Sequence, residues 1–258
     1  MIENQSGVEK KHDPAEVAIV IPARMNSKRL PGKPMRVVRG KPMIEWAWRA
    51  AESSKLASVR YVVVDHEKIA DWCISEDVRY FLDATPRNSG SDRVAAFIKR
   101  GLREKDYACL QKVKHIIVLQ CDEPDITGED IDSLIRVIRG KVPMATLSCP
   151  YSDKIARVPP IESWPEIVKV VADRFDNALY FSRSAIPGRV HVGVYGYSLA
   201  TLRSFADSGK NGRGHLEKIE DLEQLRAMEM GTPIRVIDLG RVVHSINTEE
   251  ELEAYNKR

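Results

Sequence analysis

The segment VAIVIPARMNSKRLPGKP, residues 17–34, decides the fold expected of this sequence. Residues 17–21 are all apolar and rich in β-branched side chains, a pattern typical of a central strand that is covered on both faces in a parallel sheet. A loop with proline and glycine follows, and Pro42 can then take the first position of a helix. Apolar residues recur at helical spacing from Ile44 to Ala51. A strand, a loop and a helix in this order open a βαβ unit, so the expected fold class is α/β.

Strands and helices continue to alternate through the first half of the sequence. Thr127 and Asp130 have the spacing of a capping box at the start of a helix, and Gly140 marks the end of that helix. Apolar runs and helical spacing predict further elements in this half: strands at residues 59–64 and 115–120, and helices from residue 67 and over about residues 91–103.

The second half, which begins after Pro143, has a more β-rich sequence and is expected to contain little helix between its strands. One helix is predicted over about residues 216–230, with Glu223 close to the apolar face that Ile219 marks. The other elements predicted here are strands at residues 144–148, 167–172, 179–181, 192–197 and 234–239, and a last helix from residue 248.

The composition is that of an ordinary globular protein. The chain has 258 residues, of which 43% are hydrophobic and 30% charged, so it can bury a sizeable core. The polar residues 1–16 are expected to be a mobile leader ahead of one domain over residues 17–258, in which residues 159–165 form a loop and not a linker.

Charge, hydropathy and cysteine spacing exclude several classes of protein. The net charge of 40 − 37 = +3 gives little attraction to nucleic acid, and no apolar run approaches the ~18 residues of a membrane span, so neither partner is expected. The four cysteines lie far apart with no C-x-x-C pair, which fits neither a zinc site nor a small disulfide framework. We therefore expect a cytoplasmic protein.

The loop over residues 22–34 is the first candidate site. Open α/β sheets bind ligands outside the carboxyl ends of their strands, and this loop follows the first strand. It combines a glycine and a hydroxyl with four cations that could cradle phosphates: Arg24, Lys28, Arg29 and Lys33. A solvated basic loop is an equal alternative on composition alone, and the spacing excludes a P-loop.

Acidic residues follow two more of the predicted strands. Asp122 and Glu123 come directly after residues 115–120, where a carboxylate could hold Mg²⁺ beside phosphates. Asp65 follows residues 59–64 in the same way. A turn or a helix cap is the commoner role for each acid taken singly, but three polar loops at three strand ends favour a shared site.

These segments together resemble the CMP-Kdo synthetases (3-deoxy-manno-octulosonate cytidylyltransferases), which join a cytidylate from CTP to an eight-carbon ulosonic acid. The resemblance covers nearly all of the chain after Val17 and is carried by IPARMNSKRLPGKP, NSGSDRVA, VLQCDEPDI, ALYFSRSAIP, HVGVYGYS and LEKIEDLEQLR. It implies a doubly wound, mostly parallel, Rossmann-like nucleotidyltransferase sheet with an inserted β-rich segment. It also implies Mg²⁺ as cofactor, CTP and a ulosonic acid as substrates, and a homodimer.

The resemblance also implies roles for single residues. The expected catalytic set is Arg24, Lys33 and Asp122, with Asp122 and Asn247 facing the metal. The expected nucleotide-binding set, in the half over residues 17–142, is Arg24, Ser27, Lys33, Asp65, Ser89, Arg93 and Gln120. The expected sugar-binding set, in the half over residues 143–258 that also serves dimerisation, is Lys169, Arg183, His191, Tyr195, Glu223 and Gln224. From the residues alone, His191 would more often be a structural histidine, and Glu223 would be an ordinary residue at the edge of an amphipathic helix.

Three departures from the family pattern keep alternatives open. Asn247 stands where the family has a second metal-binding aspartate, so its amide oxygen could ligate but brings no charge. Cys121 replaces a glycine, and the stretch between Pro187 and His191 is shorter by more than a helical turn. The chain could therefore activate another acidic sugar, such as a nine-carbon ulosonate, or be a catalytically weak protein that binds sugar nucleotides.

Overall fold

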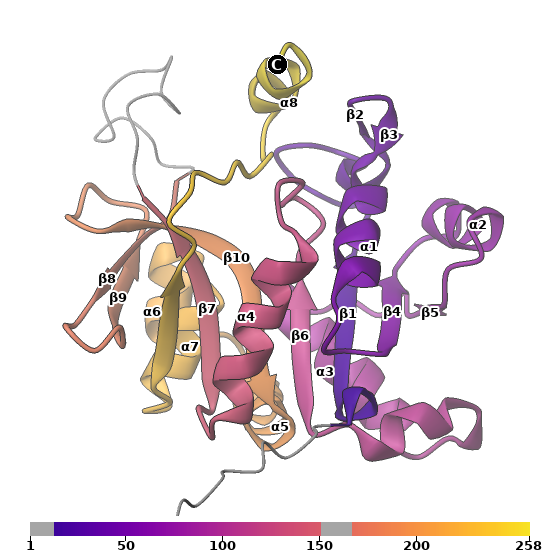
Figure 1. Ribbon diagram of the computed structural model, residues 1–258, viewed down its shortest axis with the longest axis horizontal. Coiled ribbons are helices and arrows are strands. Elements are labelled where there is room, and N and C mark those ends of the chain that lie inside the picture. The colour runs from indigo at the N-terminus through magenta and orange to yellow at the C-terminus, as the bar shows by residue number, and fades with distance from the viewer. Residues whose placement is uncertain (1–12, 151–166) are drawn as a thin grey trace, which may run out of the picture.

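The computed structural model describes residues 13–150 and 167–258, and Figure 1 shows their arrangement. Most of the expected leader and the loop expected at residues 159–165 lie outside the described residues. The strands are β1 (Val17–Ala23), β2 (Val37–Val38), β3 (Lys41–Pro42), β4 (Val59–Val64), β5 (Tyr80–Leu82), β6 (His115–Leu119), β7 (Met144–Cys149), β8 (Lys169–Ala172), β9 (Ala178–Ser182), β10 (Arg189–Ser198) and β11 (Ile234–Asp238). The α-helices are α1 (Met43–Ser53), α2 (Glu67–Ser75), α3 (Gly90–Gly101), α4 (Gly128–Arg139), α5 (Leu199–Ser208), α6 (His215–Glu220), α7 (Gln224–Glu229) and α8 (Glu249–Asn256).

One nine-stranded sheet contains strands from both halves of the sequence. Its central order is β11-β7-β10-β6-β1-β4-β5, with the hairpin β8–β9 attached to β10. β1 pairs in parallel with β4 and β6, and β7 pairs in parallel with β11. β10 runs antiparallel to both β6 and β7. The expected mostly parallel α/β sheet is therefore confirmed.

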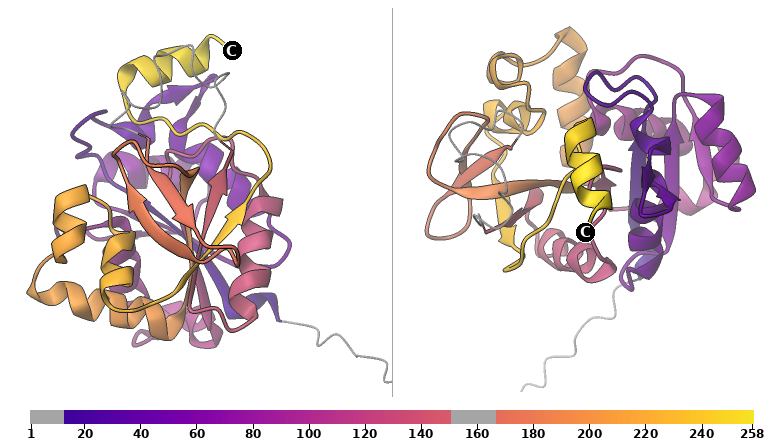
Figure 2. Two further views of the ribbon diagram at one scale, coloured as in Figure 1. Left: turned by 90° about the vertical axis from the view of Figure 1, so that its left-hand side faces the viewer. Right: turned by 90° about the horizontal axis from the view of Figure 1, so that it is seen from above.

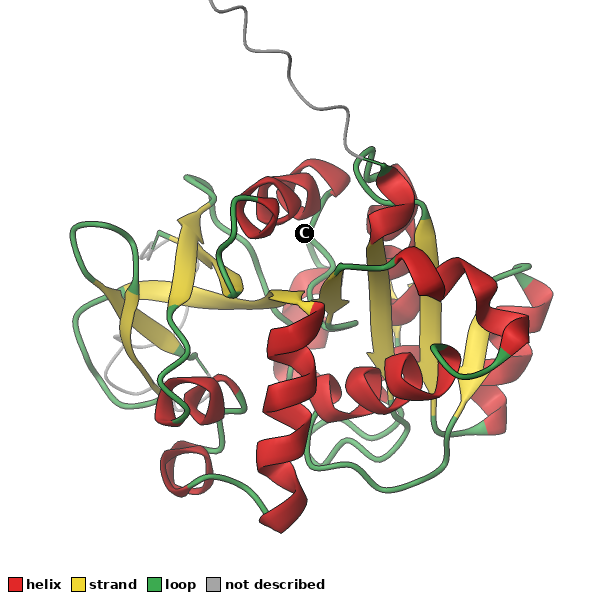
Figure 3. Cartoon of the chain, turned by 90° about the horizontal axis from the view of Figure 1, so that it is seen from below, coloured by secondary structure: helices red, strands yellow, loops and turns green. Residues whose placement is uncertain are grey.

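Helices cover both faces of this sheet, as Figure 3 shows. Alternate residues of β1 point to opposite faces, and all of them are buried. Ile19 and Ile21 pack in one core with residues of α1, α2 and α4, whereas Ala18 and Val20 pack in the other with residues of α3 and α5. The unbroken apolar run at the start of the domain is thus required by burial on both sides.

Local signals in the first half place its elements well. Thr127 accepts a hydrogen bond from the backbone of Asp130, whose side chain accepts one from Thr127 in return, and this capping box starts α4. Gly140 is the C-cap of the same helix. The strand predicted at residues 59–64 has those bounds in the structure.

Two predictions for the second half are wrong. α5 directly follows β10, in a half of the chain where little helix was expected. It was not predicted because no proline or glycine separates the strand from the helix and because only Leu202 and Phe205 are buried on it. The helix predicted over residues 216–230 is divided into α6 and α7 by Asp221, which has a left-handed backbone (φ 54°). Ile219 is 66% exposed and does not mark an apolar face.

A third, smaller core joins the loop after β1 to the C-terminal helix. Figures 1 and 2 show α8 at one end of the molecule, beside the small β2–β3 hairpin that the sequence did not predict. Tyr255 of α8 donates a hydrogen bond to Asp125 in the loop after β6. The members of this core are Leu30, Val38, Met43, Ile246, Leu252 and Tyr255. α8 therefore covers the basic loop.

No helix within residues 13–150 and 167–258 has the length and apolar character needed to cross a membrane.

Candidate active site

A cavity of about 840 Å³ lies at the carboxyl ends of β1 and β6. Its wall combines the loop after β1, the start of α3, part of β10, the segment around α6 and α7, and the C-terminal segment. The sequence-predicted residues that line it are Arg24, Ser27, Lys33, Ser89, Arg93, Gln120, Asp122, Arg183, His191, Tyr195, Glu223, Gln224 and Asn247. Residues from both halves of the chain are thus brought together around one space.

Asp65 does not line this cavity but supports residues that do. Its Oδ1 accepts a hydrogen bond from the backbone of Met25 at 2.9 Å, and its Oδ2 lies 3.8 Å from Nη2 of Arg93. The loop is also closed on itself, because the backbone N–H of Gly32 donates to the Met25 carbonyl at 3.0 Å. Gly32 has a φ of 68°, a conformation that glycine adopts without strain. The structure therefore gives Asp65 a positioning role instead of the expected direct contact with a ligand.

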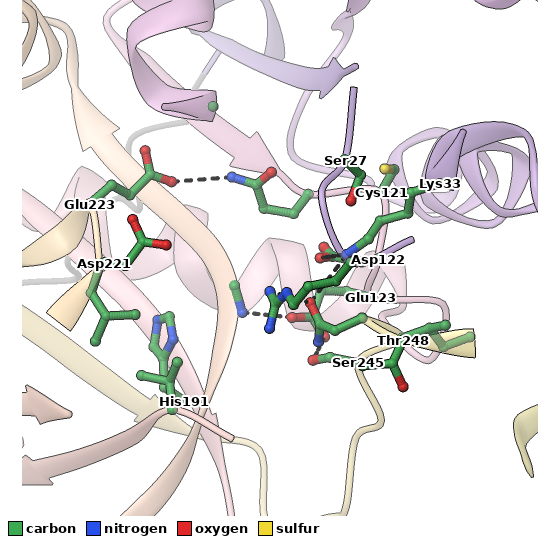
Figure 4. Close-up of a pocket in the computed structure, with 18 of the residues that line it drawn as sticks. Ser27, Lys33, Cys121, Asp122, Glu123, His191, Asp221, Glu223, Ser245 and Thr248 are labelled. Atoms are coloured by element: carbon green, nitrogen blue, oxygen red, sulfur yellow. Dashed lines mark hydrogen bonds and ion pairs between the residues drawn. The ribbon is translucent and has the colours of Figure 1, made fainter. Parts of the chain in front are cut away.

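Lys33 is the point where three parts of the chain meet. Its Nζ donates to Oδ2 of Asp122 at 2.8 Å and to Oδ1 of Asn247 at 3.1 Å, and Figure 4 shows Lys33 directed at Asp122. Arg29 also donates to Oδ1 of Asn247, at 3.3 Å. An aspartate and an asparagine that are far apart in sequence thus direct their oxygens at one cation.

Glu123 is a site residue that the sequence-based assignment missed. Its side chain is 4% exposed, and it accepts hydrogen bonds from the backbone of Gly193 at 2.9 Å and from Oγ of Ser245 at 2.8 Å (Figure 4). Burial and the neighbouring Asp122 raise its pKa to about 8. Its place beside Asp122 was the available signal. A pair of acidic residues at the end of a strand does not show, however, which carboxylate faces the ligand and which one forms hydrogen bonds within the protein.

The other end of the cavity contains a second set of paired polar groups. Nε2 of Gln120 donates to Oε1 of Glu223 at 3.2 Å, and the backbone of Ser91 donates to Oε2 of Glu223 at 3.0 Å. Burial raises the pKa of Glu223. A Cβ at Gly90 would lie 2.6 Å from Nε2 of Gln120, so a larger residue there would displace the Gln120 amide. The Gln120–Glu223 hydrogen bond thus connects a residue of the predicted nucleotide-binding set directly to a residue of the predicted sugar-binding set.

Arg226, which the sequence-based assignment did not include, connects the helices on either side of this pair. It is 2% exposed, and its guanidinium donates to Asp92 of α3 and to Glu217 of α6, with closest distances of 2.7 Å in each case. A buried guanidinium requires such paired carboxylates. Arg226 thereby fixes α6 and α7 against the start of α3.

Lys169 does not reach the cavity, contrary to the expectation that it binds sugar. It is fully buried, and its Nζ donates to the backbone carbonyls of Ile167 at 2.8 Å and Arg183 at 2.6 Å. The Arg183 backbone N–H donates to Glu220 at 3.0 Å. Lys169 and Glu220 thus hold the backbone of Arg183, which does line the cavity.

His191 and Tyr195 face the cavity from β10. Nε2 of His191 lies 3.0 Å from the hydroxyl oxygen of Thr146, and the hydroxyl of Tyr195 donates to Oε1 of Gln224 at 3.0 Å. The two rings lie 5.5 Å apart. Burial, with a smaller contribution from Arg183, lowers the pKa of His191 to about 3, so this imidazole is neutral at physiological pH.

Comparisons with known proteins show which proteins this chain is similar to. A family model described as cytidylyltransferase matches residues 18–236. A 3-deoxy-manno-octulosonate cytidylyltransferase of Anaeromyxobacter sp. (strain Fw109-5) is 36% identical, over 92% of this chain and 94% of that protein. An 8-amino-3,8-dideoxy-manno-octulosonate cytidylyltransferase of Shewanella sediminis is 33% identical, over 94% of this chain and 98% of that protein.

A solved structure extends the similarity to three dimensions. It is that of a CMP:2-keto-3-deoxy-manno-octonic acid synthetase complexed with CTP, and it superposes with a TM-score of 0.78 at 30% sequence identity. The match covers 94% of this chain and 97% of that chain. The shared fold therefore includes both the first half of the sequence and the β-rich second half.

The buried His191 predicts how stability depends on pH. Its pKa falls from 6.5 to about 3 on folding, so between these values the unfolded chain binds a proton that the folded chain does not. Acidification should then lower the free energy of unfolding by up to ~1.4 kcal/mol per pH unit through this residue. Urea denaturation between about pH 7 and pH 4 should give a shallower pH dependence for His191→Gln than for the wild type. Parallel slopes would show that His191 is protonated freely in the folded protein.

Proposed function

This chain belongs to the cytidylyltransferase family, and from that premise we propose that it transfers the cytidylyl group of CTP to 3-deoxy-manno-octulosonate or its 8-amino analogue, with release of pyrophosphate. The observation that carries the proposal is the single cavity in which the basic loop, Asp122 and Arg183 meet. Cations and a strand-end carboxylate suit a triphosphate, and a guanidinium suits the carboxylate of an acidic sugar.

In the proposed reaction the anomeric hydroxyl of the sugar attacks the α-phosphorus of CTP in line, and pyrophosphate leaves. Phosphoryl-type transfers need positioning and charge neutralisation more than covalent help from the protein. Arg24 and Lys33 supply positive charge to the phosphates. Ser27 contributes a hydroxyl beside them, and Ser89, Arg93 and Gln120 contact the nucleoside. No residue has to act as a nucleophile.

Asp122 and Asn247 would hold Mg²⁺. Their oxygens already converge on one cation, Nζ of Lys33, at 2.8 and 3.1 Å, which supports a cation site at this point. Within residues 13–150 and 167–258, no group of three or more His, Cys, Asp or Glu side chains could form a metal site by itself. That fits Mg²⁺, which commonly takes one or two protein ligands and completes its shell with substrate phosphates and water. When bound, the ion would neutralise the charge that develops on the phosphates.

The sugar occupies the side of the cavity formed by the second half of the chain. Arg183 binds the sugar carboxylate, since its guanidinium can donate two parallel hydrogen bonds. His191, Tyr195, Glu223 and Gln224 supply polar atoms for the hydroxyl groups. Lys169 does not contact the sugar itself. It positions Arg183 through its hydrogen bond to the Arg183 backbone carbonyl.

The enzyme is further proposed to be a homodimer in the cytoplasm. Phe175 and Leu179 are both exposed on the β8–β9 hairpin, which supports a partner surface there. The four cysteines are free, as suits a reducing compartment that also supplies CTP.

Pyrophosphate release tests the proposed function. CTP and magnesium should be incubated with 3-deoxy-manno-octulosonate, with its 8-amino analogue and with a nine-carbon ulosonate in turn. Release should be fastest with one of the two octulosonates. Fastest release with the nine-carbon sugar would overturn the proposed sugar class. CTP binding without release for any sugar would instead identify a binding protein.

Asp122→Asn should reduce magnesium-dependent turnover by several powers of ten, because it removes a charged oxygen from the metal and the reacting phosphates. Each tenfold loss corresponds to ~1.4 kcal/mol of barrier. Asp71→Asn, the same change at an exposed position on α2, is the matched control and should behave as wild type. Steady-state rates of both variants measure the effect on turnover, and circular dichroism shows whether each variant keeps its fold. Turnover near the wild-type rate in Asp122→Asn would remove this residue from the metal site.

Asn247→Asp should lower the magnesium concentration needed for half-maximal activity. A carboxylate binds a hard dication more tightly than an amide oxygen does, and the new group would keep the contacts with Lys33 and Arg29. Magnesium titration of turnover measures the effect. An unchanged magnesium dependence would exclude residue 247 from the metal shell.

A further inference from the structure

β10 contains an irregularity beside the cavity. Val192 pairs with Leu147 of β7, but the next residue of β10 that pairs with β7 is Tyr195, opposite Thr146. Gly193 and Val194 are therefore extra residues relative to β7. Side chains contact the backbone of this segment: the Gly193 N–H donates to Glu123 at 2.9 Å, and the Val194 carbonyl accepts from Thr146 at 2.9 Å.

The hydroxyl of Thr146 has one proton, and it donates this proton in a hydrogen bond to a carbonyl of the irregular segment of β10. Its Oγ1 lies 2.9 Å from the carbonyl oxygen of Val194 and 3.3 Å from that of Val192. A carbonyl oxygen can only accept, so the hydroxyl must donate to one of the two. Thr146 is fully buried, so its hydroxyl proton is directed at one of these carbonyls and not at solvent.

His191 must consequently donate to Thr146. Nε2 lies 3.0 Å from Oγ1, and the hydroxyl proton is already directed at a carbonyl, so the hydrogen in this contact belongs to Nε2. The low pKa of the ring keeps it neutral, which leaves Nδ1 with a free lone pair. The ring itself is held between Phe181, at 5.1 Å edge to face, and Tyr195.

We propose that Thr146 is a positioning residue that fixes His191 in the tautomer with a protonated Nε2, so that Nδ1 accepts a hydrogen bond from a hydroxyl of the bound sugar. The identity of that ligand rests on the proposed function, whereas the tautomer does not. His191 lines the cavity, and within the described part of the chain its ring makes no hydrogen bond besides the one with Thr146. An acceptor at this position selects a hydroxyl or an amine and repels a carboxylate, which leaves the sugar carboxylate to Arg183.

Nitrogen NMR of the full-length protein labelled with ¹⁵N-histidine tests the tautomer directly. His191→Gln identifies the resonances of this ring among the six histidines. Nε2 should carry the proton and Nδ1 should be bare at neutral pH, and 3-deoxy-manno-octulosonate alone should shift the Nδ1 resonance. A proton on Nδ1, or no shift in a protein that the sugar saturates, would overturn the proposal.

Kinetics of two Thr146 variants supply an independent test. Thr146→Ser keeps the hydroxyl and should leave both KM values close to wild type. Thr146→Val keeps the shape but cannot accept from Nε2, so KM for the sugar should rise about tenfold while KM for CTP stays unchanged. Equal KM values for the sugar in wild type and a folded Thr146→Val would overturn the proposal. If valine prevents folding, the NMR measurement on the wild-type protein still decides it.

The failure of this proposal is distinct from a failure of the proposed function. The latter would appear in the wild-type enzyme, as the absence of pyrophosphate release with every octulosonate. The tautomer of His191 is measured without CTP and without turnover, so a proton found on Nδ1 would refute the role of Thr146 even in an active enzyme.

Discussion

The buried carboxyl group of Glu123 is the interaction on which the geometry of the active site depends. It lies between the loop after β6, the irregular segment of β10 at Gly193, and the C-terminal segment at Ser245. Burying an acid is unfavourable unless hydrogen bonds compensate for the lost water. Those bonds align Asp122 on one side with the strand that carries His191 on the other. The two halves of the chain are thus joined at the point where their substrates must meet.

Around this junction most polar groups are already paired with one another. Lys33 contacts Asp122 and Asn247, Gln120 contacts Glu223, and a buried arginine ties α3 to α6. Such pairing holds the side chains in place before substrates arrive, which reduces the entropy lost on binding. It also means that any anion that binds Lys33 must replace its contacts with Asp122 and Asn247, so binding and rearrangement of these contacts are one event.

Sequence patterns predicted those helices and strands that depend on neighbouring residues alone. The α4 cap at Thr127 and the doubly buried first strand follow from neighbouring residues alone. The break at Asp221 was missed because it depends on how α6 and α7 pack, not on periodicity. The resemblance indicated which residues gather at the cavity but not how each one acts: Asp65 supports its neighbours, and Thr146 acts through a histidine on another strand. Roles of this kind arise from tertiary contacts, which no single segment encodes.

The helix that covers the basic loop comes from the opposite end of the described chain. The backbone of Arg39 donates to the side chain of Asn256, 217 residues further along, and Leu30 packs in the same small core as Leu252. A ribosome therefore releases the loop long before it releases its cover. Until the last turn of α8 has emerged, the nascent chain exposes the apolar side chains of this core to chaperones and proteases. Synthesis that stops before α8 therefore leaves this small core open and its apolar side chains exposed.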